Sequence, residues 1–114
     1  MKVLRRKYNF LRDVSSLPKN ERIKYLNECR KENIDDICEA MHNVLKGHCS
    51  IKKKHICKKF DNIQKEVEKV VNPKGKLSVK RKILTSQSGE GIFTIIASTV
   101  LPFLLNLLSR KNKK

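Results

Sequence analysis

The chain has 114 residues, enough for one small domain with a tail. It carries 27 Lys and Arg against 11 Asp and Glu, a formal net charge of +16, so we expect a polyanionic partner such as nucleic acid or an anionic membrane surface. With no Trp, 2 Tyr and 4 Phe, the chain has too few aromatic rings for sequence-specific single-strand binding by base stacking. The composition favours contacts between basic side chains and phosphate groups.

The first segment, MKVLRRKYNFLRDV, is basic but lacks the apolar core of a secretory signal. We therefore expect an intracellular protein whose 4 Cys are reduced. Within this segment Val3, Leu4, Tyr8 and Leu11 recur at helical spacing. This pattern predicts a first amphipathic helix.

Three further helices are predicted before residue 72. One begins near Pro18, with Ile23 and Leu26 on its apolar face, and the next is IDDICEAMHNVLKG, which Gly47 should end. The last, IKKKHICKKFDNIQKEVEKVV, has an apolar stripe made of Ile51, Ile56, Phe60, Ile63, Val67, Val70 and Val71. The sequence thus predicts an all-α fold, a small bundle of about four short helices over residues 3–71.

Pro and Gly in the sequence NPKGK interrupt the helical pattern after Val71. The segment SVKRKILTSQ then predicts a short helix, and SGEG predicts a flexible turn. We interpret residues 72–91 as a Lys-rich linker that contains both. Residues 92–109 are predicted to form an apolar C-terminal helix hinged on SGEG, and residues 110–114 a basic tail.

The run from residue 92 to residue 108 contains no charge. As a helix it would be about 25 Å long, against a bilayer core of ~30 Å. Thr94, Ser98, Pro102 and Asn106 form one mildly polar stripe along it. Three interpretations stay open: a helix docked on the domain, a tail anchor, or a segment that self-associates or inserts conditionally. The predicted membrane or assembly residues are Ile92, Phe93, Ile95, Ile96, Val100, Leu101, Phe103, Leu104, Leu105, Leu107 and Leu108.

Residues 51–82 contain 12 Lys and Arg and 3 Asp and Glu, the most positive part of the chain. In IKKKHICKK the cations follow the exposed arc of a helix, and in KGKLSVKRK they lie in a flexible segment. Movable cations can follow a phosphate backbone without reading bases, whereas the alternative is a solvated surface that only aids solubility. The predicted DNA-binding residues are Lys52, Lys53, Lys54, Lys58, Lys59, Lys74, Lys76, Lys80, Arg81 and Lys82.

The Cys and His residues predict no metal site. Cys38 and His42 lie four residues apart, but their spacing to His48, Cys49, His55 and Cys57 matches no familiar zinc finger. A free Cys near an apolar stripe behaves as a small hydrophobic residue. Because the sequence also lacks a phosphate-cradling glycine loop and an orienting group for a nucleophile, we expect neither an enzyme nor a cofactor.

One long segment, KRKILTSQSGEGIFTIIASTVLPFLLNLL, resembles the C-terminal motif of adenovirus-type minor core proteins. These are the precursors of core peptide mu and their relatives in adintoviruses and Maverick/Polinton-like elements. Their pattern is a basic stretch, an apolar pair, a Gln, a glycine pair and an apolar helix. The first half is matched by Lys80, Arg81, Ile83, Leu84 and Gln87, and the glycine pair is approximated by Gly89 and Gly91.

An upstream pattern of the same family, R…L…C…IC.A..N.L.G, is matched by Arg22, Leu26, Cys29, Ile37, Cys38, Ala40, Asn43, Leu45 and Gly47. The chain departs from the family where Glu90 separates the glycines and Thr94 replaces a common Pro. It also lacks the dense Arg run of the mu peptide. The resemblance implies a virion or mobile-element protein associated with packaged DNA in the host nucleus or the virion.

Two functional classes therefore stay open. The first is non-specific duplex-DNA binding, with the apolar helix serving assembly or self-association. The second is a tail-anchored or membrane-active protein whose cations contact anionic headgroups. A helical adaptor for one protein partner would not need this much positive charge.

Overall fold

The computed structural model describes residues 2–47 and 54–112, although the side chains of residues 55, 56 and 110–112 are outside the description. The elements in chain order are α1 (Lys2–Ser16), α2 (Lys19–Glu28), α3 (Lys31–Leu45), α4 (Lys54–Val71), α5 (Leu77–Leu84), α6 (Gln87–Ile95), the π-helical segment η1 (Ile96–Val100) and α7 (Leu101–Asn112). The described ranges contain no strand, so the prediction of a small all-α bundle is confirmed.

Local sequence signals mark several ends of these helices. Pro18 lies directly before α2, where its fixed φ suits a helix start. Gly47 follows α3 with φ of +79°, a left-handed conformation that glycine adopts without strain. Pro73 and Gly75 lie in the connection between α4 and α5. These boundaries agree with the punctuation expected from the sequence.

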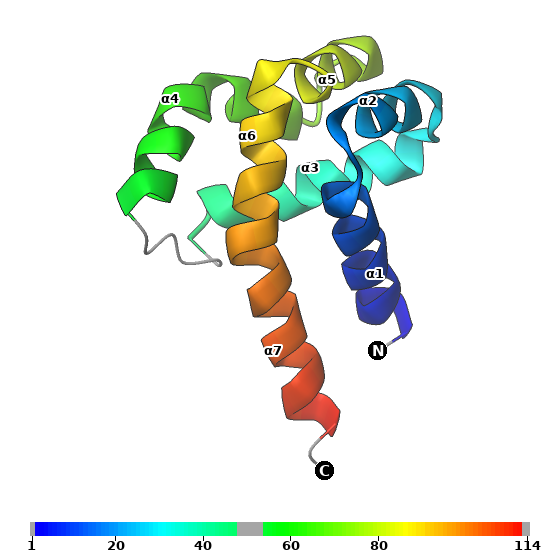
Figure 1. Ribbon diagram of the computed structural model, residues 1–114, viewed down its shortest axis with the longest axis vertical. Coiled ribbons are helices and arrows are strands. Elements are labelled where there is room, and N and C mark those ends of the chain that lie inside the picture. Colours follow the sequence, from blue (N-terminus) through cyan, green and yellow to red (C-terminus); the bar gives the residue numbers. More distant parts are fainter. Residues whose placement is uncertain (1, 48–53, 113–114) are drawn as a thin grey trace.

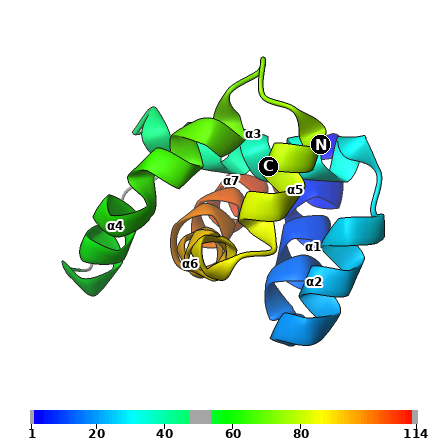
Figure 2. The same ribbon diagram turned by 90° about the horizontal axis from the view of Figure 1, so that it is seen from above.

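The helices are arranged around the apolar C-terminal segment. Figure 1 shows α6, η1 and α7 as one continuous helix through the middle of the molecule, with α4 on one side and α1 on the other. Figure 2 looks along this helix and shows α1 and α2 on the side opposite α4. Segment α6 packs on α4 and α5, η1 packs on α1 and α3, and α7 packs on α1. The apolar segment is thus the central helix of the bundle.

One hydrophobic core joins all parts of the chain. Ile92, Ile95 and Ile96 are fully buried, as are Leu26 of α2 and Val67 of α4. They share this core with Leu11, Val14, Ile34, Ile37, Met41, Val44, Val70, Leu84 and Val100. Each fully buried Leu or Ile contributes about 1.5–3 kcal/mol, so the buried residues between 92 and 100 contribute a large part of the stability of the bundle. Residues 3–71, predicted as a domain of their own, share one core with this segment.

The predicted flexible turn at SGEG is wrong. Residues 88–91 lie in the first turns of α6, and the chain instead breaks at Thr85 and Ser86. A Cβ atom at Gly89 would lie 1.9 Å from the carbonyl oxygen of Leu84, so only glycine allows α6 to begin this close to the end of α5. The glycines serve close packing, which sequence punctuation alone does not distinguish from flexibility.

The central helix passes through Pro102 without ending. Proline has no N–H to donate and its ring collides with the carbonyl four residues earlier. Directly before it, η1 widens to π-helical geometry, in which the N–H of Leu101 donates to the carbonyl of Ile96. The wider turn accommodates the proline, and α7 then continues to Asn112.

Candidate nucleic-acid interface

Helix α4 presents a row of lysines to solvent. Lys54, Lys58, Lys65 and Lys69 are all exposed, and their spacings of four, seven and four residues place them on one face of a helix. The opposite face buries Val67 and Val70 in the core. Because 15 residue steps separate Lys54 from Lys69, the row is about 22 Å long. We call these four lysines the α4 cationic face.

The row continues beyond the end of α4. Lys74 and Lys76 are exposed in the connection to α5, and the backbone N–H of Lys74 donates to the Asn72 side chain at 3.0 Å. Asp61 lies on the same side of α4, between Lys58 and Lys65, and is exposed. The surface is therefore strongly but not uniformly positive.

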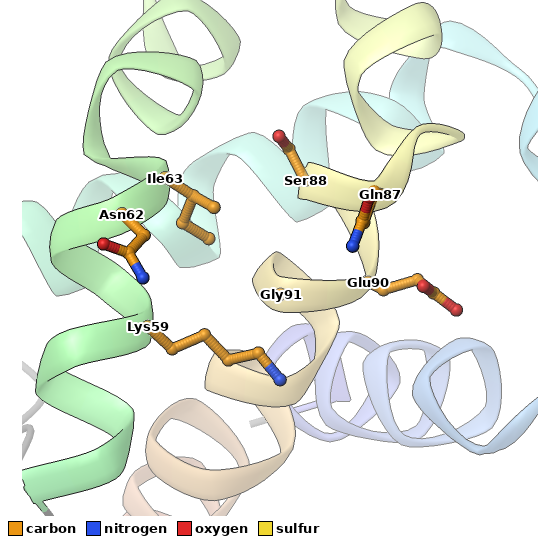
Figure 3. A pocket seen from close by; sticks show the side chains of 7 residues that line it. All are labelled: Lys59, Asn62, Ile63, Gln87, Ser88, Glu90 and Gly91. Atoms are coloured by element: carbon orange, nitrogen blue, oxygen red, sulfur yellow. The ribbon is translucent and has the colours of Figure 1, made fainter.

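Lys59 lies on a different side of α4 from Lys58. Figure 3 shows its side chain extending over a pocket between α4 and α6, near Gly91 and Glu90. Glu90 also forms an ion pair with Lys19, at an Nζ–Oε2 distance of 3.6 Å. The sequence grouped Lys58 and Lys59 together, but the structure places them on separate surfaces.

Two predicted DNA-binding residues on α5 point inward. Lys80 is only 7% exposed. The guanidinium of Arg81 donates to the carbonyl oxygens of Leu26 at 2.5 Å and of Cys29 at 2.6 Å, at the end of α2. Arg81 thus satisfies carbonyls that the helix end leaves unpaired. Neither residue belongs to the exposed cationic surface in this conformation.

The remaining predicted DNA-binding residues are in two groups, one exposed and one outside the described part of the chain. Lys82 is exposed on α5, and Lys52 and Lys53 lie outside the described residues. Lys65 and Lys69 were missed by the sequence analysis, which selected dense Lys clusters. The signal that identifies them is the spacing along α4, because residues at these intervals share a face with Lys54 and Lys58.

The residues predicted for membrane contact or assembly divide along the central helix. Ile92, Phe93, Ile95, Ile96, Val100 and Leu108 are buried. Leu101, Phe103, Leu104 and Leu107 are half-buried, whereas Leu105 is 50% exposed. The polar stripe of Thr94, Ser98, Pro102 and Asn106 faces solvent. The structure therefore docks the apolar helix on the rest of the chain.

Two thiols lie close to the α5 cations, of which Cys38 is buried and Cys29 is partly buried. Cys38 is 8% exposed, and burial raises the pKa of its thiol to about 11, an effect that the nearby charge of Lys80 partly opposes. Burial also raises the pKa of Cys29, which lies beside Arg81. High thiol pKa values are typical of unreactive structural cysteines. His48 and Cys49 lie outside the described residues.

By length and composition, one described helix could cross a membrane. It spans Gln87–Ser109, and its most apolar 18-residue window has a mean hydropathy of 2.0 and is 44% buried in the bundle. A core helix of a soluble protein has the same properties, so this is weak support for a membrane span.

Comparisons with protein-family models, curated proteins and solved structures gave no match.

Proposed function

We propose that this chain binds duplex DNA non-specifically through the α4 cationic face and its continuation at Lys74 and Lys76, as a core-associated protein of a virus or mobile genetic element. The observation that carries the proposal is the alignment of four exposed lysines on one face of a single helix. The likeness to adenovirus-type minor core proteins supports a setting with packaged DNA. The exposed part of α7 around Leu105 is then the surface for assembly.

The dimensions of this surface suit a phosphate backbone. Duplex DNA carries one charge per ~1.7 Å of axis, so about 13 phosphates lie along the ~22 Å that the lysine row covers. The lysines sit on a rigid helix, and their long side chains reach phosphates without a fixed base register. If six phosphates are neutralised, the logarithm of affinity should fall with the logarithm of salt concentration at a slope of about −5.

The test is a salt titration of full-length protein with two duplexes of unrelated sequence. Replacing Lys54, Lys58, Lys65 and Lys69 together by Gln should make the slope shallower by about 3.6 and should weaken binding to both duplexes equally. Gln preserves helix propensity, so α4 should remain folded. Fluorescence anisotropy at five or more salt concentrations measures both quantities.

A matched control removes the same number of charges elsewhere. Lys2, Arg5, Lys24 and Lys46 are also exposed, on or near α1, α2 and α3. If their replacement by Gln changes the slope as much as the α4 variant does, binding depends on net charge and the proposed interface is incorrect. A strong preference for one duplex would contradict non-specific binding.

A second candidate function is membrane association, favoured by the length and apolarity of Gln87–Ser109. Insertion of this helix would require the core to open, because Ile92, Ile95 and Ile96 are fully buried in it. Such a protein would expose its central helix to lipid only after release from the bundle. The cations would first bind anionic headgroups, at about 1 kcal/mol each near the surface.

The membrane alternative predicts that the full-length chain stays on vesicles containing phosphatidylserine after a high-salt wash. Leu105→Arg should then reduce retention, because Arg opposes insertion, although at this position near the end of the span it costs less than the roughly 2.5–3.5 kcal/mol of a central Arg. Leu105 is half exposed, so this change leaves the folded bundle intact. Complete release of both proteins by salt would show electrostatic adsorption and remove this candidate. Vesicle flotation provides the measurement.

A further inference from the structure

A small cavity lies between the first turns of α3 and α5, at the end of the connection that follows α4. Its volume is about 220 Å³. The lining residues are Lys31 and Asp35 of α3, Pro73 and Gly75 of the connection, and Leu77 and Lys80 of α5. The cavity is separate from the α4 cationic face, and neither DNA binding nor packing of the core accounts for its composition.

Lys80 is the unusual residue in this cavity. Lysine is almost never buried without a partner, yet Lys80 is only 7% exposed. Among residues 2–47 and 54–112, no carboxylate lies within 4.0 Å of its ammonium and no acceptor is hydrogen-bonded to it. The Lys80 stem is enclosed, but its ammonium nitrogen is not fully shut off from solvent, so an anion in the cavity would supply the partner that the surrounding residues do not.

Gly75 positions the end of the Lys80 side chain at the cavity. A Cβ atom at Gly75 would lie 3.2 Å from Cε of Lys80 and 3.1 Å from the carbonyl oxygen of Asn72. The Lys80 side chain therefore lies against the bare backbone of Gly75, which itself lines the cavity. Any other residue at position 75 would compete with Lys80 for this space.

The surrounding charges leave Lys80 uncompensated. Lys31 and Asp35 form an ion pair with an Nζ–Oδ2 distance of 2.9 Å, so their charges largely cancel. Helices α3 and α5 both begin without a side-chain cap, at Arg30 and Lys76. The N–H groups of a first helical turn and the positive end of the helix dipole favour anions. The first turns of α3 and α5 both border this cavity.

We propose that this cavity is a binding site for a phosphate group, with the Lys80 ammonium as its charged partner and the first turn of α5 as the second source of donors. A DNA backbone phosphate and a free phosphate ion have the same recognition chemistry here. The proposal does not depend on DNA binding by α4, although the cavity lies directly beyond Lys74 and Lys76 and would extend that surface.

The test uses full-length ¹⁵N-labelled protein titrated with inorganic phosphate against chloride at constant ionic strength. Saturable amide shifts are expected at Gly75, Leu77 and Ser78. Lys80→Met keeps an unbranched side chain but removes the charge, and it should weaken phosphate binding at least tenfold. Lys82→Met removes an exposed charge from the same helix and should leave phosphate binding unchanged.

Shifts that do not saturate, or that are the same in wild type and Lys80→Met, would overturn the proposal. If Lys80→Met fails to fold, Gly75→Ala gives an independent test, because its Cβ would lie 3.2 Å from Cε of Lys80 and would shift the end of that side chain by a few tenths of an ångström. This variant should also weaken phosphate binding. Unchanged binding in a folded Gly75→Ala variant would count against the site.

A second titration, with a short duplex, distinguishes the source of the phosphate. If the duplex shifts the amides of residues 75–78 and Lys80→Met abolishes only these shifts, the occupant is a backbone phosphate. If inorganic phosphate saturates the site but the duplex leaves these amides unchanged, the occupant is a free phosphate. If neither phosphate source shifts them, the cavity is not a phosphate site, whatever the affinity of α4 for DNA.

Discussion

The cations of α4 and those of α5 come from segments of similar composition, but the fold uses them differently. On α4, Lys58 and Lys65 point into solvent and make the surface positive. On α5, Lys80 is buried and Arg81 is hydrogen-bonded to backbone carbonyls at the end of α2. The cations of α4 therefore form an exposed positive surface, whereas Arg81 of α5 joins two helices through hydrogen bonds.

The number of neighbours explains the difference. Helix α4 packs through one face on α3, α5 and α6, so most of its circumference remains exposed. Helix α5 has 8 residues and contacts α2, α3, α4 and α6. A helix this short and this enclosed has little free surface, so some of its polar side chains must find partners inside the bundle. Lysine density alone does not reveal which case applies.

Among single substitutions of these cations, the loss of Arg81 should have the largest effect on stability. Arg81→Met should lower the free energy of unfolding by about 3 kcal/mol, because two charge-assisted hydrogen bonds disappear and two carbonyls lose their donor. For a domain of this size the melting temperature should fall by about 10 °C. Lys82→Met removes the same charge from an exposed position and should change stability by less than about 0.5 kcal/mol.

Urea denaturation followed by circular dichroism measures both variants. Equal destabilisation by Arg81→Met and Lys82→Met would contradict a structural role for Arg81, since it would mean that the two cations contribute only through net charge. If the Arg81→Met protein were as stable as the wild type but bound DNA more weakly, Arg81 would contribute to DNA binding and not to the packing of the helices.

A smaller effect concerns Cys38, which lies near Lys80 in the inward-facing region. Burial raises the pKa of its thiol from 9.0 to about 11, so the folded state holds the proton more tightly than the unfolded state. This contribution to stability is complete below pH 9 and is lost as the pH rises towards 11. Between pH 8 and pH 10.5 the wild type should lose about 2 kcal/mol more than Cys38→Ala.

The measurement is chemical denaturation of both proteins at each pH in the presence of a reductant. The cavity left by Cys38→Ala lowers stability by the same amount at both pH values, so it does not affect the difference. Parallel losses in the two proteins would show that the Cys38 thiol is as accessible to solvent when folded as when unfolded.

Much of the fold followed from local pattern. The apolar spacing in the sequence predicted the helices, Gly47 marked the end of α3, and the polar stripe at Thr94 and Ser98 is the solvent side of the central helix. The Lys content of residues 54–76 was also visible, although only the helical spacing shows that Lys65 and Lys69 join Lys54 and Lys58. These features depend on neighbours within a few turns of one helix.

Tertiary structure alone decided the remaining features. The sequence could not show that Gly89 packs against the backbone of Leu84 rather than forming a hinge, because that contact depends on how α6 leaves α5. It could not show that Lys80 and Arg81 turn inward, because their neighbours come from α2, α3 and the 72–76 connection. Periodicity fixes which residues share a face of a helix, whereas the partner of each face is set by packing between segments far apart in the chain.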